Sequence, residues 1–568
     1  MKGSDRAGAP VRLLSALVFA FTGLLACSTE VPTSTQVDTG GDDVGSLVNE
    51  GLFGVSSQNG SVNVTLYPGP SAVVGSTTTV SFGAPFPRMA LRDAGRLRAF
   101  DTGGDELPIH VRETLRWRVF PGSGTHDSIR AAVVSIQIRF DDRSPRVIRL
   151  QIGSAPGVTM PAPSNPIASW VAVSDGEYPA GTVREPRVYA SFPTTWLSRC
   201  VLRSRTLAVG AEAEWGWFDD FQIGAAHTAV NDVPDEVVER VNYTTDAEPW
   251  LFDRTATLFG VFARTGDVKW LRHAHRSAQF YRAHLNGAGY FDLKNGDLKY
   301  SYGRSLLMDY IFTGDPANID AIERIATAGE EWDPTYDLGT NFWTERHQTY
   351  ALMAALSAWE ATGEAAYANR ARAIADVSFE LASDPVGSWQ ADGCMLHGMT
   401  AHEGAGGDVP ICSPWMSALF ADEIWEYYIH SRDPRSLEFL AGLGHYVADY
   451  GLYGGGEGLD YDMPWYLSSS VKTFSDEGPW GDIEHTCDVA GLVARGAWAE
   501  KQLGHDPAGL ISVVDQLLVS CEKNLSIWHR PGSESSGKAE WRLSPARKFN
   551  WWFGTTSDLP WLMAALQL

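Results

Sequence analysis

The sequence predicts a multidomain β + α protein: an N-terminal antiparallel β-sandwich or small barrel followed by an α/α toroid of five or six helical hairpins. Three observations predict it. Short segments with alternating apolar and polar residues dominate the first part of the chain. Helices joined by similar short junctions recur in the second half. Tryptophans gather in the long segments between these hairpins. We place the β domain at 51–200, a linker at 201–245 and the toroid at 246–568.

Residues 1–27 have the features of a bacterial lipoprotein signal peptide. A basic start precedes the apolar stretch Leu13–Leu25, which is too short to span a bilayer as a helix. The following Leu24-Leu25-Ala26-Cys27 resembles a lipobox, in which Cys27 becomes the lipid-modified first residue; an ordinary signal peptide is the alternative. Residues 28–50 are rich in Ser, Thr, Asp and Gly, which predicts a flexible tether. We therefore expect a lipid-anchored protein of the cell envelope, at the outer membrane.

The charge and the length of the chain narrow its possible partners. A net charge of −24 argues against nucleic acid and anionic lipid. The roughly 520 residues that follow the signal peptide and tether are too many for one small core, so two or three domains are expected. We predict a monomer whose partner is a polysaccharide or oligosaccharide substrate and which meets the membrane only through its N-terminal lipid.

Five cysteines remain besides Cys27, and an exported protein can keep disulfides. Cys394 and Cys412 flank one loop, so they are the pair that we expect to be joined. The odd count leaves at least one thiol free, most simply a buried one.

The β domain is predicted from segments of period-two alternation that Gly, Pro and Asp clusters separate. Frequent turns between such segments are typical of an antiparallel sandwich or small barrel. The predicted strands are Val62–Tyr67, Thr78–Phe82, Thr114–Phe120, Ala131–Phe140 and Val147–Ile152.

One stretch of this domain, Val80-Ser81-Phe82-Gly83-Ala84-Pro85-Phe86-Pro87-Arg88, resembles the opening of the exo-rhamnogalacturonan lyase-like family. The resemblance continues loosely through Leu107–Val111 and Thr125–Arg130. It implies an accessory β domain ahead of an α/α toroid that acts on a polysaccharide, and it transfers no catalytic residue. The alternative is a generic β-sandwich with a similar Gly-Pro-Pro turn.

The helical hairpins share their turns. A Gly near the end of one helix permits a left-handed C-cap, and the acid after it can cap the next helix. Successive junctions lie 48, 49, 69 and 72 residues apart, and every insertion falls between hairpins. Stacked hairpins would place the tight turns at one end and the long loops at the other, which we call the mouth. The junctions begin at Thr265, Thr313, Thr362, Ser431 and Leu503.

Inner helices of such a ring are apolar on most sides, and outer helices are amphipathic. A flat α-solenoid is the alternative architecture. The predicted inner helices are Trp250–Ala263, Ser305–Phe312, Tyr350–Trp359, Trp415–Tyr428, Val489–Ala499 and Trp552–Leu568. The predicted outer helices are Val268–Leu285, Ile319–Ala328, Tyr367–Leu381, Leu437–Tyr450 and Leu510–Leu525.

The mouth loops are rich in Trp, whose faces suit the C–H bonds of sugar rings, although such residues can also fill loop cores.

Clusters of polar residues lie where the predicted inner helices begin. Eliminative cleavage of a uronate polymer needs a group that masks the carboxylate, a base and an acid. His and Tyr suit the last two roles, provided that an Arg lowers the Tyr pKa. Our catalytic candidates are Tyr302, His347, His485, Arg304 and Arg346, and our substrate-binding candidates are Asn341, Trp343, Tyr300, His402 and Trp480.

We therefore predict a polysaccharide lyase that cleaves a uronate-containing glycan by β-elimination. Two alternatives stay open. A glycoside hydrolase needs two carboxylates across the mouth, and several acids are available. A surface glycan-binding lipoprotein would use the ring as a rigid platform. The available acids are Asp333, Glu345, Asp476, Glu477, Glu484 and Asp488.

The loop between Cys394 and Cys412 contains enough ligand types for zinc, including His397, His402 and Glu403. Its spacing matches no zinc finger or His-Glu-x-x-His pattern, and export favours a disulfide. We therefore expect no metal and no cofactor.

Overall fold

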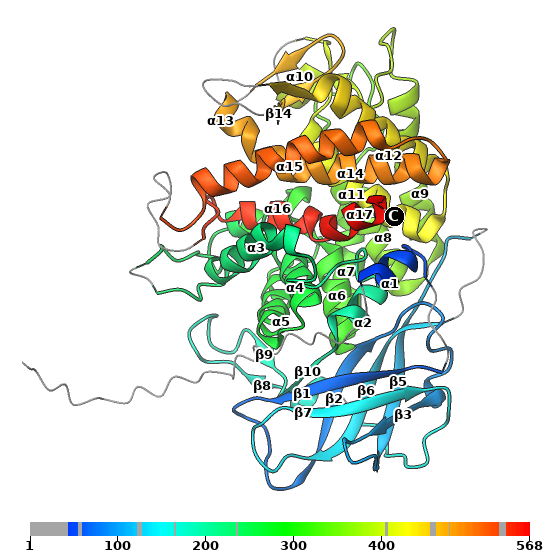
Figure 1. The fold of residues 1–568 in the computed structure, drawn as a ribbon, viewed down its shortest axis with the longest axis vertical. Coiled ribbons are helices and arrows are strands. Elements are labelled where there is room, and N and C mark those ends of the chain that lie inside the picture. Colours follow the sequence, from blue (N-terminus) through cyan, green and yellow to red (C-terminus); the bar gives the residue numbers. More distant parts are fainter. Residues whose placement is uncertain are drawn as a thin grey trace, which may run out of the picture.

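The computed structural model describes residues 44–54, 59–121, 128–163, 166–234, 237–403, 407–454, 462–475, 478–532 and 541–567. Figure 1 shows a β domain at the lower end of the molecule and a larger helical domain above it. Cys27, with the rest of the predicted signal peptide, lies outside the described residues. No helix in the described ranges is long and apolar enough to cross a membrane.

In the described residues, two antiparallel sheets form the body of the β domain, as predicted, and β8 (Val171–Ala172) and β9 (Arg184–Glu185) form a further short pair. One sheet has the order β10-β1-β7-β3-β4 and the other β2-β6-β5. The first contains β1 (Ser61–Pro68), β3 (Leu97–Phe100), β4 (Glu106–Leu107), β7 (Arg146–Ile152) and β10 (Val188–Ser191), and the second contains β2 (Thr77–Pro85), β5 (Ile109–Arg116) and β6 (Ile129–Arg139).

The burial of the strands follows their position. Along β1, Val62, Val64 and Leu66 are buried while the residues between them are more exposed, which is the period-two pattern of a strand with one covered face. The central strand β6 is buried along nearly its whole length. It packs between β2 and β5 and also contacts the helix α6 (Gly303–Thr313). The three-stranded sheet therefore joins the β domain to the helices.

The helical domain is a closed ring of six inner helices, which confirms the toroid class. Each inner helix contacts the next in chain order, and the last returns to the first. No flat solenoid would close in this way. The inner helices are α4 (Arg254–Thr265), α6, α8 (Glu345–Thr362), α11 (Pro414–Ser431), α14 (Thr486–Leu503) and α16 (Arg547–Thr556).

Outer helices pair with the inner ones along the ring. The predicted outer helices are present as α5 (Val268–Ala283), α7 (Ala317–Glu330), α9 (Ala365–Ser383), α12 (Arg435–Tyr446) and α15 (Ala508–Trp528). The helix that covers the closing point is α3 (Gly216–Ala229), which contacts α4, α15 and α16.

Two segments that we expected to be connectors belong to the folded body. Helix α3 falls inside the predicted linker 201–245, and its Phe218 and Phe221 pack against Phe553 of α16 at ring distances of 5.5 and 5.3 Å. The end of the predicted tether forms α1 (Val44–Asn49), which buries Leu47 and Val48 and contacts α17 (Leu559–Gln567). Burial of apolar side chains explains why neither segment is a free linker.

The predicted helix turns are confirmed. Gly266, Gly314, Gly363 and Gly504 end their helices in the left-handed conformation, with φ between 63° and 81°. At the fourth junction Arg432 takes this conformation instead, with φ of 57°. Three of these glycine turns face the β domain, since a Cβ on Gly266, Gly314 or Gly363 would lie within 4 Å of Phe192, Val133 or Arg118, whereas a Cβ on Gly504 meets nothing. The plain end of the ring is thus the end that rests on the sheets.

The disulfide differs from our prediction. The bond joins Cys487 of α14 to Cys521 of α15, whose Cα atoms are 5.1 Å apart. Cys394 and Cys412 are buried free thiols, as is Cys200. The bonded pair lies on two adjacent helices, a proximity that only the packing of α14 on α15 creates.

Gly83, in the stretch that resembles the lyase-like family, marks the contact between the two domains. A Cβ at this position would lie 2.3 Å from the carbonyl oxygen of Ile311 and from the carbonyl carbon of Phe312, both in α6. The strand backbone can approach the helix this closely only without a side chain.

We expect Gly83→Ala to lower the free energy of unfolding by about 1–3 kcal/mol, because the added methyl group must push β2 away from α6. Denaturant unfolding of the purified protein measures this change. Gly287→Ala is the matched control, since a Cβ there meets nothing within 4 Å. Equal stability of the two variants would contradict this account of the domain contact.

Candidate active site

A pocket of about 350 Å³ opens at the mouth of the ring. Residues at or just before the N-terminal ends of all six inner helices contribute to it. The N-terminus of a helix carries partial positive charge and attracts anions. Its lining residues are Leu251, Phe252, Lys294, Lys299, Tyr300, Arg346, Trp415, Tyr466, Gly481, Asp482, Glu484, His485, Arg547, Lys548 and Trp551.

His485 stands in an aromatic wall of the pocket. Its ring stacks on Trp415 at 4.9 Å and lies 4.1 Å from the ring of Trp551. Behind these rings, Trp551 Nε1 donates a hydrogen bond of 2.7 Å to Asp488 Oδ2, which is 3.6 Å from His485 Nδ1. Burial raises the pKa of Asp488 well above its usual value. Asp488 therefore positions the two rings and does not itself line the pocket.

Cations outnumber carboxylates in the pocket. Five cationic side chains line it, beside the carboxyl groups of Asp482 and Glu484. Lys548 forms an ion pair with Glu484, whose side chain is 27% exposed. Asp482 is buried and accepts a hydrogen bond of 2.7 Å from the Tyr453 hydroxyl. A positive pocket in a chain of net charge −24 is a local arrangement that suits an anionic ligand.

Tyr300 does not gain the lowered pKa that our elimination scheme requires. Burial raises the pKa of its hydroxyl, and Asp297 raises it further. Arg547 and Arg346 lower it, but they do not outweigh the burial. The phenol is therefore a poor base at neutral pH.

The structure brings together one member of each predicted residue type: Tyr300, Arg346 and His485 line the pocket. Tyr302 and Arg304 do not line it. Arg304 is buried at the ring axis, where it contacts the acids of α11.

Tyr302 supports the floor of the pocket. Its hydroxyl donates to the Lys299 carbonyl oxygen at 2.6 Å and accepts from the Phe252 backbone N–H at 2.9 Å. Phe252 and Asp253 both have positive φ, 72° and 58°, which is strained for residues other than glycine. The Tyr302 hydroxyl thus holds a strained segment at the start of α4.

The other candidates also lie away from this pocket. His347 packs against Trp332 at 5.3 Å and faces Thr344, and burial followed by the charge of Arg346 lowers its pKa to about 3. Trp343 is fully buried, and Asn341 is exposed outside the pocket lining. His402 instead lies in a group with Glu345 and His397, in which one side-chain atom of each residue is within 4.8 Å of the other two. The side chain of Trp480 lies outside the described residues.

Several lining residues were missing from our candidates, above all the cations Lys294, Lys299, Arg547 and Lys548, and the acid Asp482. All five lie in the first turn of a helix or short 3₁₀ helix, namely Asp292–Lys294, Leu298–Tyr300, Pro479–Asp482 and α16. Their positions at the starts of helices were the sequence signal that could have identified them as pocket residues. Without knowing that α16 closes the ring, the sequence does not connect Arg547 and Lys548 to α14.

The chain matches no family model and no curated protein. The resemblance to the exo-rhamnogalacturonan lyase-like family is thus supported only in its coarser implication, a β domain ahead of an α/α ring.

Solved structures of several carbohydrate enzymes are similar at low sequence identity. An unsaturated glucuronyl hydrolase mutant from Streptococcus agalactiae, complexed with the disaccharide dGlcA-GalNAc6S, has a TM-score of 0.41 and 14% identity, over 63% of this chain and 93% of that chain. An inactive α-1,6-mannanase variant of Salegentibacter, complexed with α-1,6-mannotetrose, has a TM-score of 0.39 and 12% identity, over 61% of this chain and 100% of that chain. Cellobiose 2-epimerase from Bacillus thermoamylovorans has a TM-score of 0.41 and 10% identity, over 60% of this chain and 98% of that chain.

We expect Tyr302→Phe to lower the free energy of unfolding by about 1–3 kcal/mol, because the Phe252 N–H and the Lys299 carbonyl would lose their buried partner. Thermal and denaturant unfolding measure this change. Tyr300→Phe is the control, with an expected change within about 0.5 kcal/mol. If Tyr302→Phe were as stable as the parent protein, the supporting role would be wrong.

Proposed function

We propose that this protein is a carbohydrate-active enzyme that binds an anionic, uronate-containing saccharide in the mouth pocket. The observation that carries the proposal is the pocket lining: five cations and a wall of aromatic rings at the N-terminal ends of the inner helices. Cations pair with the uronate carboxylate, and indole and phenol rings stack on sugar faces.

Hydrolysis is the chemistry that the pocket supports best. Asp482 and Glu484 supply the two carboxyl groups that glycosidic hydrolysis needs, one as an acid and the other as a base or nucleophile. Glu484 is the more exposed of the two and can meet water, whereas Asp482 is buried in the wall. The raised pKa of Tyr300 argues against an elimination in which this residue acts as the base.

β-Elimination is the second candidate, and the convergence of Tyr300, Arg346 and His485 favours it. Arg346 could mask the uronate carboxylate and His485 could remove the adjacent proton. Tyr300, with its proton retained, could then protonate the leaving oxygen.

Attachment through Cys27 to the outer membrane stays a prediction.

Product analysis separates the two chemistries. We expect the purified protein to release new reducing ends from a uronate-containing oligosaccharide without a rise in absorbance near 235 nm. Asp482→Asn and Glu484→Gln should each lower kcat by at least about 100-fold. Asp333→Asn is the control, because this exposed acid lies outside the pocket.

A rise in absorbance near 235 nm that disappears in His485→Ala would instead establish elimination. If neither signal appeared on a broad panel of acidic glycans, a binding protein would replace both enzymatic proposals.

The cations of the pocket should govern affinity for the anionic substrate. We expect Lys294→Gln and Arg547→Gln each to raise KM by about 3- to 10-fold, because each removes one charge-assisted contact. The effect should shrink when the substrate carboxylates are esterified. Lys523→Gln on the exposed side of α15 is the charge-matched control. An equal loss with neutral and anionic substrates would contradict the electrostatic role.

A further inference from the structure

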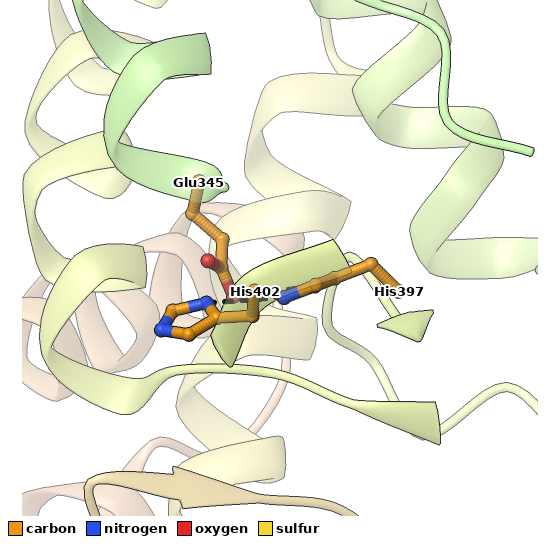
Figure 2. A group of neighbouring side chains, drawn as sticks. All are labelled: Glu345, His397 and His402. Atoms are coloured by element: carbon orange, nitrogen blue, oxygen red, sulfur yellow. Dashed lines mark hydrogen bonds and ion pairs between the residues drawn. The ribbon is translucent and has the colours of Figure 1, made fainter. Parts of the chain in front are cut away.

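Three metal-ligating side chains from separate segments converge beside the mouth. Glu345 is the first residue of α8, His397 lies in the short strand β11 (His397–Gly398), and His402 lies in α10 (Met399–Glu403). One potential ligand atom from each lies within 4.8 Å of the other two. Figure 2 shows the carboxylate and the two imidazole rings gathered around one point.

The two histidines face each other with ring nitrogens. His397 Nε2 and His402 Nδ1 are 3.3 Å apart. The other nitrogen of His397, Nδ1, is 3.3 Å from the Met395 carbonyl oxygen. A backbone carbonyl can only accept, so Nδ1 carries the proton and the lone pair of Nε2 points toward His402. This is the tautomer that presents Nε2 to a metal ion.

Glu345 adds a buried carboxylate to this group, and its Oε1 lies 3.7 Å from His397 Nδ1. Its side chain is fully buried, and Oε1 accepts a hydrogen bond of 2.7 Å from the Ser413 backbone N–H. Oε2 is buried without a hydrogen-bond partner among the described residues. A buried carboxylate oxygen without a partner is costly, and a bound cation would remove that cost.

The distance between the two histidine nitrogens fits a tetrahedral site. With Zn–N distances of 2.0–2.1 Å, two nitrogens of a tetrahedron lie about 3.3 Å apart, as the two histidine nitrogens do. We propose that Glu345, His397 Nε2 and His402 Nδ1 bind a divalent transition-metal ion, zinc in the first place. Two imidazoles and one carboxylate suit zinc, whereas calcium and magnesium prefer all-oxygen sites. Water can complete the coordination from the side of the partly exposed His402.

The ion would fasten the long loop between α9 and α11 to the start of α8. His402 also contacts the ring of Tyr466 at 6.1 Å, and Tyr466 lines the mouth pocket. The metal therefore stabilises one wall of the pocket from behind. It is a structural ion in this arrangement, because its three ligands do not line the pocket.

Zinc binding to the purified full-length protein tests the site. The protein is stripped with a chelator, titrated with zinc chloride and analysed by calorimetry and by elemental analysis after gel filtration. We expect one tightly held zinc per chain. His402→Ala and Glu345→Gln should each weaken its binding at least tenfold, and cobalt in place of zinc should show the visible absorption of a tetrahedral site, lost in both variants.

A second His-Glu-His group supplies the control. His445 and His505 both pair with Glu500, at 2.7 and 2.6 Å, and both are more than half exposed. Their nitrogens flank the carboxylate, so a zinc ion held there would depend on His505. Unchanged binding in His505→Ala supports the proposed site. The proposal is overturned if the protein binds no zinc, if His402→Ala and Glu345→Gln bind it as the parent does, or if binding depends on His505.

Discussion

A buried ion-pair network at the axis of the ring is the constraint on which the rest of the structure depends. Arg304 of α6 reaches three acids of α11, with 2.6 Å to Glu423, 3.2 Å to Asp422 and a further contact to Glu426. Burial raises the pKa of Glu423 to about 7, whereas Arg304 and His430 lower that of Glu426 against the effect of burial. Removing one partner of such a pair would leave a buried charge uncompensated, at a cost of about 3–5 kcal/mol.

The network ties the parts of the chain together and decides where a ligand can enter. Arg495 of α14 pairs with Asp422 at 2.9 Å and with Asp558 at 3.0 Å, which joins α11 to the C-terminal helices. Arg130 of the β domain pairs with Glu360 of α8, so the sandwich also takes part. Charged side chains fill the axis of the ring, and the cavity among them holds only about 20 Å³, roughly one water molecule. Within the ring, a saccharide therefore fits at the mouth and not at the axis.

The fold was largely predictable, and the site only in part, for identifiable reasons. Glycine-ended helices such as the one before Gly266 carry a local signal, so the hairpins could be placed. Helix α3 lacks the repeated junction that marks the hairpins, so its place at the closing point of the ring could not be predicted. Inner helices are buried on all sides, and a shift of a few positions along the chain determines whether a side chain faces the mouth or the axis. Tyr300 faces the mouth, whereas Arg304, one turn later, reaches the axis. Periodicity does not distinguish these positions.

The start of α8 shows how closely the mouth is coupled to its support. Glu345 and Arg346 are consecutive, yet Glu345 faces the two histidines behind the wall and Arg346 lines the pocket. Ser413, whose hydroxyl oxygen caps the start of α11, donates its backbone N–H to the same Glu345 carboxylate. An ion at this carboxylate would thus fix the first turns of two neighbouring inner helices at once. Since Arg346 and Trp415 stand in those turns, the position of a cation and of an aromatic ring in the pocket follows from one buried carboxylate.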